Sequence, residues 1–150
     1  MAAIGARPAT DTLDFLGGFV AAEGTLVHTG RRFAFRVSLG ACDLPSCELF
    51  RTWLGVGTIT VAPRRAERYD DEATYAVQAI PELVEVVVPF LDEHLPPSYK
   101  REQYLVWRSE LMTYWDERAR RRRPCTVAGC DEPRRARGLC RRHYYAAHGR

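Results

Sequence analysis

The sequence has no run that approaches the roughly 20 consecutive apolar residues needed to cross a membrane as a helix. Residues 1–10, which we expect to form a flexible N-terminal tail, lack the apolar stretch of a secretory signal. The sequence also lacks a glycine-rich phosphate loop with a Lys-Ser or Lys-Thr pair, and the nucleophile elbow of serine hydrolases. We therefore expect a cytoplasmic protein with no membrane partner and no organic cofactor.

Lysine is almost absent, because Lys100 is the single lysine among 22 basic residues. We expect it in the first turn of a helix, where a positive charge opposes the helix dipole. A compact ammonium suits stabilisation of a phosphorane better than a bulky guanidinium does. Lys100 is therefore a candidate catalytic residue, and the alternative is a chance survivor of an arginine-rich composition.

Positive charge is concentrated at the C-terminal end of the chain. Residues 118–150 hold 11 of the 22 basic residues but only two of the 19 acidic ones, so residues 1–117 are net acidic. A soluble segment with this charge typically binds nucleic acid, because neutralised phosphates release condensed counterions. A solvated or membrane-surface tail is the alternative. We expect residues 118–124 to be an arginine-rich linker.

The five cysteines do not predict a disulfide framework in a reducing compartment. Cys125, Cys130, Cys140 and His143 follow the spacing C-x4-C-x9-C-x2-H, which supplies the four thiolate and imidazole ligands of a structural zinc ion. So short and polar a segment cannot bury a core, and bound metal would provide its folding free energy. We therefore predict a zinc-binding module over residues 125–150. His148 is a less suitable fourth ligand, and Cys42 and Cys47 are interpreted as packing residues.

Residues 11–117 are predicted to form one α+β domain. Two hairpins, over 25–39 and 58–79, have strands with one apolar face. Helix signals occur over 11–23, 45–54 and 98–118, and a further helical stretch begins at Pro81. Gly24 and Gly55 are expected to end the first two helices, and Pro89 to interrupt the third. The predicted order is α-β-β-α-β-β-α-α.

Adjacent glycines in the first predicted helix cost on the order of 1 kcal/mol each relative to alanine, which suggests a close approach of two backbones. Small residues at helical spacing would let this helix pack against its copy in a homodimer. The expected interface residues are Leu13, Leu16, Gly17, Val20 and Ala21.

The stretch from Leu16 to Gly24, LGGFVAAEG, followed by two hairpins separated by a helix, resembles the LAGLIDADG family of homing endonucleases. The resemblance covers about residues 12–116. It implies an αββαββα saddle on double-stranded DNA, and the single motif copy implies a homodimer. The C-terminal tail resembles small zinc modules attached to other nucleases.

The resemblance also implies the chemistry. Glu23, the last residue of the motif helix, would bind catalytic Mg²⁺ together with its symmetry mate. Lys100 matches the family's basic residue at the start of the last helix, and Gln103 completes a Lys-x-x-Gln pattern. A solvated helix-end side chain is the alternative for Glu23.

DNA contacts are expected from the open face of the sheet and from the basic tail, since a β-ribbon can enter the major groove and arginines can contact phosphates. The sheet and its loops would contribute Val27, Thr29, Arg31, Arg32, Arg36, Ser38, Thr58, Thr60, Arg64, Arg65, Arg68, Thr74 and Gln78. The tail would contribute Arg120, Arg121, Arg122, Arg123, Arg134, Arg135, Arg137, Arg141 and Arg142.

The sequence thus predicts a homodimeric, Mg²⁺-dependent homing endonuclease that cuts a long pseudo-palindromic site and carries a zinc module. Two alternatives stay open. One is a DNA- or RNA-binding regulator or splicing helper that has lost cleavage on the same scaffold. The other is an unrelated zinc-dependent interaction module on an α/β domain, which would be a monomer without affinity for DNA.

Overall fold

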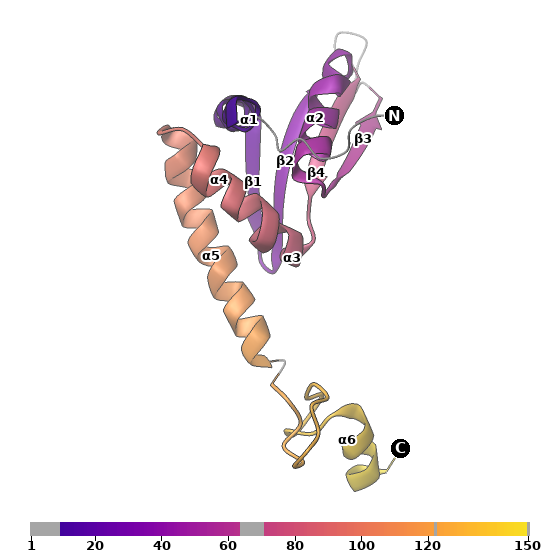
Figure 1. The fold of residues 1–150 in the computed structure, drawn as a ribbon. Coiled ribbons are helices and arrows are strands. Elements are labelled where there is room, and N and C mark those ends of the chain that lie inside the picture. Colours follow the sequence, from indigo (N-terminus) through magenta and orange to yellow (C-terminus); the bar gives the residue numbers. More distant parts are fainter. Residues whose placement is uncertain (1–9, 64–70, 122, 150) are drawn as a thin grey trace, which may run out of the picture. The chain divides into compact units, whose positions relative to one another are not determined.

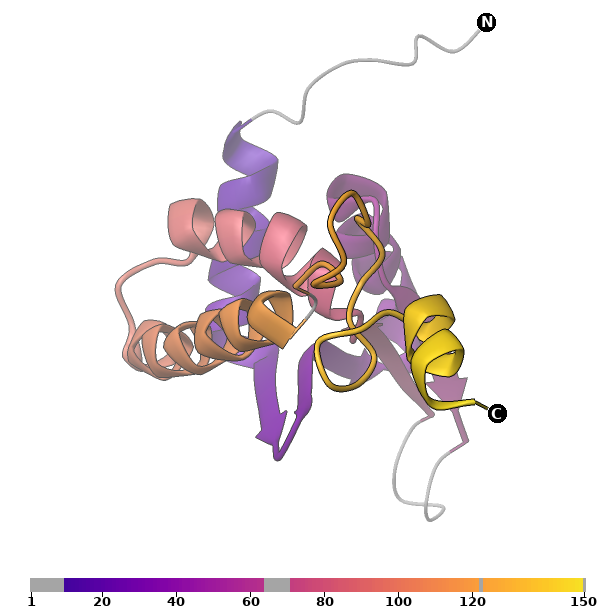
Figure 2. The same ribbon diagram turned by 90° about the horizontal axis from the view of Figure 1, so that it is seen from below.

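The computed structural model describes residues 10–63, 71–121 and 123–149, and it divides into two units, Met1–Leu111 and Met112–Arg150. The first unit contains a four-stranded antiparallel sheet and helices that lie on one of its faces (Figures 1 and 2). The second contains the end of a long helix and a cysteine-rich segment. No helix of these described ranges combines the length and apolar character that crossing a membrane requires.

The chain begins with helix α1, Thr10–Glu23, and continues directly into the hairpin of β1, Gly24–Thr29, and β2, Arg32–Gly40. Gly24 is required at the change of direction, because a Cβ there would lie 2.5 Å from Val20 Cγ1 and 2.6 Å from the Val20 carbonyl oxygen. Gly30 adopts φ +62° in the hairpin turn, a conformation that favours glycine. The predicted helix and both predicted strands are confirmed.

Helix α2, Leu44–Leu54, follows a 3-10 turn, Ala41–Asp43, and ends where Gly55 adopts φ 70° and donates its N–H to the Arg51 carbonyl. Strands β3, Thr58–Ala62, and β4, Glu72–Val77, form the second hairpin. The sheet order is β1-β2-β4-β3, so β1 and β3 are the edges. This is the α+β architecture that the sequence predicts.

The third predicted helix continues through Pro89, and the interruption expected there takes the form of a π-helical turn just before the proline. Helix α3, Ile80–Glu82, passes into a π-helical turn, Leu83–Val87, and then into α4, Val88–His94. Pro89 has no N–H for the carbonyl four residues earlier, and its ring crowds that carbonyl. The wider π-turn immediately before it accommodates the proline without ending the helix.

Aromatic side chains fill the core between α2 and the sheet. Phe35, Phe50 and Tyr75 are fully buried, and the Phe50 ring stacks on Tyr75 at 5.6 Å between centroids. Burial raises the pKa of Tyr75, whose hydroxyl donates to the Val56 carbonyl at 2.9 Å. Cys47 is buried here as expected, but Cys42 is exposed in the 3-10 turn, so its interpretation as a packing residue was wrong.

Helix α5, Tyr99–Arg121, is the last helix of the first unit and extends into the second. Tyr104, Trp107 and Leu111 are buried on one face, as the periodicity predicts. The expected linker begins inside this helix, because the backbone of residues 118–121 is helical. Arginine has a high helix propensity, so a run of arginines extends a helix as readily as it forms a linker. The second unit ends with α6, Arg141–His148.

Candidate active site, nucleic-acid interface and metal centre

Glu23 is the last residue of α1, and its side chain is exposed, in the position that the sequence predicts. The chain continues into β1, whose second residue, Thr25, lines a cavity of about 680 Å³. The exposed carboxylate therefore lies two residues along the chain from the wall of this cavity.

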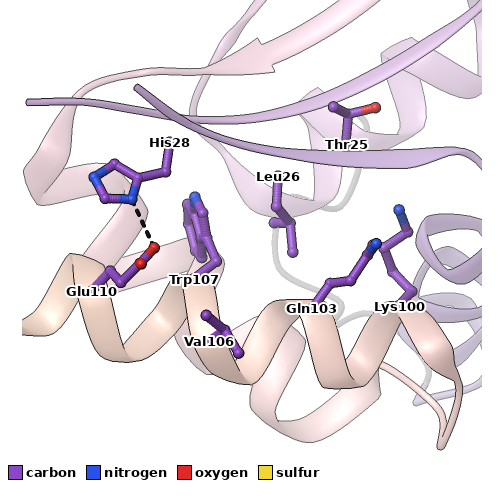
Figure 3. A pocket seen from close by; sticks show the side chains of 8 residues that line it. All are labelled: Thr25, Leu26, His28, Lys100, Gln103, Val106, Trp107 and Glu110. Carbon is purple, nitrogen blue, oxygen red and sulfur yellow. Dashed lines mark hydrogen bonds and ion pairs between the residues drawn. The ribbon is translucent and has the colours of Figure 1, made fainter. Parts of the chain in front are cut away.

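The cavity lies between β1 and the first half of α5 (Figure 3). Lys100 and Gln103 lie side by side at its end nearest Thr25. Lys100 is half-buried and Gln103 is exposed. The structure thus brings together the two α5 residues predicted for the site, one as a cation and one as a hydrogen-bonding amide.

Ser98 fixes the beginning of α5 and with it the place of Lys100. Its hydroxyl oxygen accepts the Arg101 N–H at 3.2 Å and its hydroxyl donates to the Pro96 carbonyl at 3.0 Å. Arg101 also binds the Leu95 and Asp92 carbonyls through its guanidinium. This capped first turn holds the single lysine of the chain at the cavity despite the unfavourable helix dipole.

His28 and Glu110 form the other end of the cavity, and sequence reasoning missed them as a pair. His28 Nδ1 lies 2.7 Å from Glu110 Oε2, and the ring stacks on Phe33 at 4.2 Å. His28 Nε2 lies 3.0 Å from the Gly30 carbonyl oxygen. Trp107 donates its indole N–H to the Val27 carbonyl at 3.0 Å. Together these contacts attach the edge strand β1 to α5.

The predicted homodimer interface is corrected by the structure. Leu16 and Val20 are 1% and 0% exposed, so they face the core of their own chain. Gly17 is buried too, because a Cβ on it would collide with the His94 carbonyl at the end of α4. The close backbone approach that glycine allows here is between α1 and α4 of one chain.

The exposed face of α1 carries different residues. Phe15 is 56% exposed, Gly18 and Ala22 are exposed, and a Cβ added to Gly18 would meet nothing within 4 Å. Residues 15, 18 and 22 recur at helical spacing on one side of the helix. Leu13 and Ala21, the remaining predicted interface residues, are half-buried.

The sheet has one face covered by helices and one open face. The strand register and the burial pattern place eight predicted DNA-contact residues on the open face: Val27, Thr29, Arg32, Arg36, Ser38, Thr58, Thr60 and Thr74. Arg31 lies in the hairpin turn, and Gln78 lies one residue beyond β4. Arg64, Arg65, Arg68 and Arg122 lie outside the described residues, as do the side chains of Arg120 and Arg121.

In the second unit, the side chains of Cys125, Cys130, Cys140 and His143 converge, and their ligand atoms all lie within 4.8 Å of one another. His143 Nδ1 is 3.2 Å from Cys125 Sγ and 3.3 Å from Cys140 Sγ, and the Cys130 and Cys140 sulfurs are 3.9 Å apart. A tetrahedral zinc ion with its usual sulfur ligands needs separations of about 3.8 Å. These four residues therefore form a group that could hold a metal ion.

Local hydrogen bonds shift the pKa values of two of these cysteines in opposite directions. Burial raises the pKa of Cys125, but N–H groups of Val127 and Cys140 and the side chains of His143 and Cys140 outweigh it and lower the pKa to about 6. For Cys130 a backbone hydrogen bond from Glu132 lowers the pKa, and burial with the neighbouring thiols outweighs it and raises the pKa. Several adjacent thiols can be deprotonated together only when a cation compensates their charge.

Exposed arginines are numerous in the unit that holds the metal-ligand group. Arg123, Arg134, Arg135, Arg137, Arg141 and Arg142 are all exposed. Arg134 donates through Nε to the Pro124 carbonyl at 2.9 Å, and the Arg135 guanidinium lies 5.9 Å from the centre of the Tyr145 ring. Arg141 and Arg142 occupy the first turn of α6. The expected basic surface is therefore present in this unit.

Comparison with known proteins gives a match of fold. No protein-family model matches the sequence, and no curated protein sequence is similar to it. The I-SmaMI LAGLIDADG homing endonuclease bound to cleaved DNA matches with a TM-score of 0.61 and 19% identity, over 76% of this chain and 40% of that one. I-CpaMI bound to uncleaved DNA matches with a TM-score of 0.59 and 18% identity, over 71% and 39%.

The I-LtrWI LAGLIDADG homing endonuclease bound to target DNA has a TM-score of 0.58 and 15% identity, over 77% of this chain and 40% of that one. The chain thus spans about two fifths of the length of these structures. Sequence identities this low show only that the architectures are similar. This chain has the fold of a LAGLIDADG homing endonuclease, a DNA endonuclease fold.

Proposed function

We propose that this protein is a site-specific DNA endonuclease that hydrolyses phosphodiester bonds in double-stranded DNA as a homodimer. One observation carries the proposal: in a homing-endonuclease fold, α1 ends in the exposed carboxylate of Glu23, two residues before a cavity that contains Lys100 and Gln103. Matching structures of this fold are described as bound to cleaved or target DNA.

Glu23 fits a role as ligand for catalytic Mg²⁺, because carboxylate oxygen is the donor that this ion prefers and this carboxylate is accessible. Bound Mg²⁺ would activate water and stabilise the leaving oxygen. Lys100 would place a compact positive charge beside the reacting phosphate, and Gln103 would orient water through its amide. In a homodimer, each chain would contribute one such set.

The exposed face of α1 supports the homodimer. Gly18 and Ala22 leave this side of the helix without bulk, so a second α1 could approach closely, and Phe15 would be covered. The described chain contains a single αββαββα unit, and a two-fold partner would supply the second sheet of a DNA-binding saddle. The target would then be a long pseudo-palindromic site.

The cysteine-rich unit is proposed to bind structural Zn²⁺ through Cys125, Cys130, Cys140 and His143, whose ligand atoms all lie within 4.8 Å of one another. The exposed arginines around it would contact phosphates outside the sequence covered by the sheet. Each phosphate neutralised would steepen the dependence of DNA affinity on salt.

The experiment that tests the proposed function compares wild-type protein with Glu23→Gln. DNA that the wild type retains from a randomised library is incubated with each protein and Mg²⁺, and binding and cleavage are measured separately. We expect Glu23→Gln to bind with similar affinity and to cleave at least about a hundredfold more slowly, because the charged metal ligand is lost while the shape is kept.

If the wild type selects a DNA motif but never cuts it in Mg²⁺, the result supports the alternative hypothesis of a regulator that binds nucleic acid without cleaving it. Equal cleavage by Glu23→Gln and wild type would instead exclude Glu23 as a metal ligand. A monomer that retains no DNA would identify the cysteine-rich unit as an unrelated interaction module.

A further inference from the structure

The open face of the sheet is built almost entirely from short side chains. Three rows across the strands consist of Gly40, Glu72 and Ala62; of Ser38, Thr74 and Thr60; and of Thr25, Arg36, Ala76 and Thr58. Towards the hairpin turn follow Val27 beside Ala34, and Thr29 beside Arg32. Of the strand residues on this face, only Arg32, Arg36 and Glu72 exceed valine or threonine in length.

These three long side chains are widely separated. Arg32 adjoins the hairpin turn, and Glu72 pairs with Gly40 at the opposite end of β2. Arg36 lies midway, four residues from Arg32 and four from Gly40, which corresponds to about 14 Å along the strand in each direction. Arg36 is therefore the one long polar side chain in the middle of the open face.

The residues next to Arg36 on the open face have short side chains. Ala34 and Ser38 flank it along β2, and Thr25 and Ala76 face it from the adjacent strands. Within the described part of the chain, no hydrogen bond or ion pair is formed by its exposed guanidinium. All five donors of the group are therefore available to a ligand that covers this face.

Two of the three hydroxyls in the row beside Arg36, those of Ser38 and Thr74, already form hydrogen bonds. Ser38 Oγ lies 2.8 Å from Thr74 Oγ1, and the Thr74 hydroxyl is also within 3.4 Å of Glu72 Oε1. Hydroxyls bonded to each other make weaker competitors for base edges than free ones do. Ala34 and Ala76 are only 5% and 8% exposed, so neither side chain offers a base edge a polar group or a substantial surface.

We propose that Arg36 is the specificity-determining residue of the sheet and reads a single guanine in each half-site, while the base pairs beside it are read loosely. This inference rests on the proposed function, since it assumes that the open face lies in the major groove of DNA. Arginine binds guanine O6 and N7 with two parallel hydrogen bonds, and no other base offers that pair of acceptors.

The proposal predicts an unusual recognition profile. Two guanines related by the dyad of the target should dominate the selected sequences, one from each protomer. Positions on either side should tolerate substitution. Arg32, at the edge of the face, should contribute to affinity as a phosphate contact that is independent of sequence.

Selection from a randomised DNA library by full-length, zinc-loaded protein tests this inference. The selection uses Ca²⁺ in place of Mg²⁺, so that binding is read without cleavage. Wild type is compared with Arg36→Ala and Arg36→Gln, and with Arg51→Ala as a matched control on the exposed side of α2. Thermal unfolding confirms that each variant is folded, which is expected because Arg36 is exposed.

We expect Arg36→Ala to lose the two guanine positions and to bind the wild-type site roughly ten- to a hundredfold more weakly. Arg36→Gln should shift these positions towards adenine, which glutamine binds with two hydrogen bonds. Arg51→Ala should reproduce the wild-type motif.

An unchanged guanine preference in Arg36→Ala, or a loss of affinity that is equal for all sequences, would overturn the inference and leave the proposed nuclease standing. A wild type that retains no DNA would instead refute the proposed function and this inference with it. The same selection therefore separates the two failures.

Discussion

Lys100 stands out among the residues of the cavity because its position in the helix is electrostatically unfavourable. It is a lysine in the first turn of α5, where the helix dipole repels a cation, and it is half-buried at a cavity. Within the described part of the chain, Lys100 forms no salt bridge that would explain the charge. The unfavourable placement is understandable if the ammonium is needed beside a phosphate.

We expect Lys100→Ala to lower the rate of DNA cleavage by about 10²–10³-fold, because a preorganised positive charge near the reacting phosphate is lost. The affinity for DNA should fall only slightly, by at most the contribution of a single phosphate contact. Single-turnover cleavage and equilibrium binding on the same DNA separate the two effects. Glu102→Ala, an exposed residue on the same turn that does not line the cavity, is the matched control.

Cleavage by Lys100→Ala at the wild-type rate would show that Lys100 has no catalytic role and that its presence reflects chance. Partial activity in Lys100→Arg would show that charge alone carries part of the role, since guanidinium is bulkier than ammonium. The control should cleave as wild type does.

The places of Glu23, Lys100 and Gln103 could be predicted from the sequence because each lies at the end of a helix that local patterns mark. A glycine follows Glu23, and a serine caps the turn of Lys100. The contact between His28 and Glu110 could not be predicted, since 82 residues separate them and only the packing of β1 on α5 brings them together.

At the scale of elements, α1 shows where periodicity fails. Its residues are apolar or small on nearly every side, so hydrophobic spacing predicts a helix without showing which side faces the core. The adjacent glycines were interpreted as one surface for a second copy. In the structure Gly17 faces α4 and Gly18 faces outwards, about 100° apart on the helix.

This division predicts opposite effects of two adjacent substitutions. Gly17→Ala should destabilise the protein by about 1–3 kcal/mol, because the new methyl group collides with the His94 carbonyl. Gly18→Ala should not destabilise the monomer and should stabilise it by up to about 1 kcal/mol through helix propensity. Urea unfolding at low protein concentration measures both.

Sedimentation equilibrium then separates association from stability. Gly18→Ala should weaken dimerisation, because the added methyl group would hold two α1 helices apart. A Gly18→Ala variant that dimerises as tightly as wild type would contradict the proposed interface. Equal stability of Gly17→Ala and wild type would contradict the packing of α1 on α4.

At the scale of the whole molecule, the two units should respond independently to metal removal. The unit with the metal-ligand group has little apolar core, so we expect it to unfold when a chelator removes zinc, while the sheet unit keeps its thermal transition. Heteronuclear NMR spectra with and without zinc would show which residues lose dispersion. One zinc ion per chain should be bound.

Cysteine variants provide the matched comparison for this prediction. Cys130→Ser should reduce zinc affinity strongly, whereas Cys42→Ser, which alters an exposed cysteine outside the group, should bind zinc as wild type does. Unchanged NMR spectra after chelation would contradict a metal-dependent fold in this unit.

The sequence predicted the order of elements and the four candidate ligands, because hydrophobic alternation and cysteine spacing are local properties. It did not predict that the arginine-rich segment continues α5 as far as Arg121. Charge density alone does not distinguish an extended linker from an exposed helix, since arginine favours both water and helical backbone.

The most direct test of the central claim is to incubate the wild-type protein with a randomised double-stranded DNA library and Mg²⁺ and to sequence both ends of every product. A homodimeric site-specific nuclease predicts staggered ends centred on a two-fold symmetric motif, with none produced when Ca²⁺ replaces Mg²⁺. Intact DNA in Mg²⁺, or ends scattered without a shared symmetric motif, would contradict it.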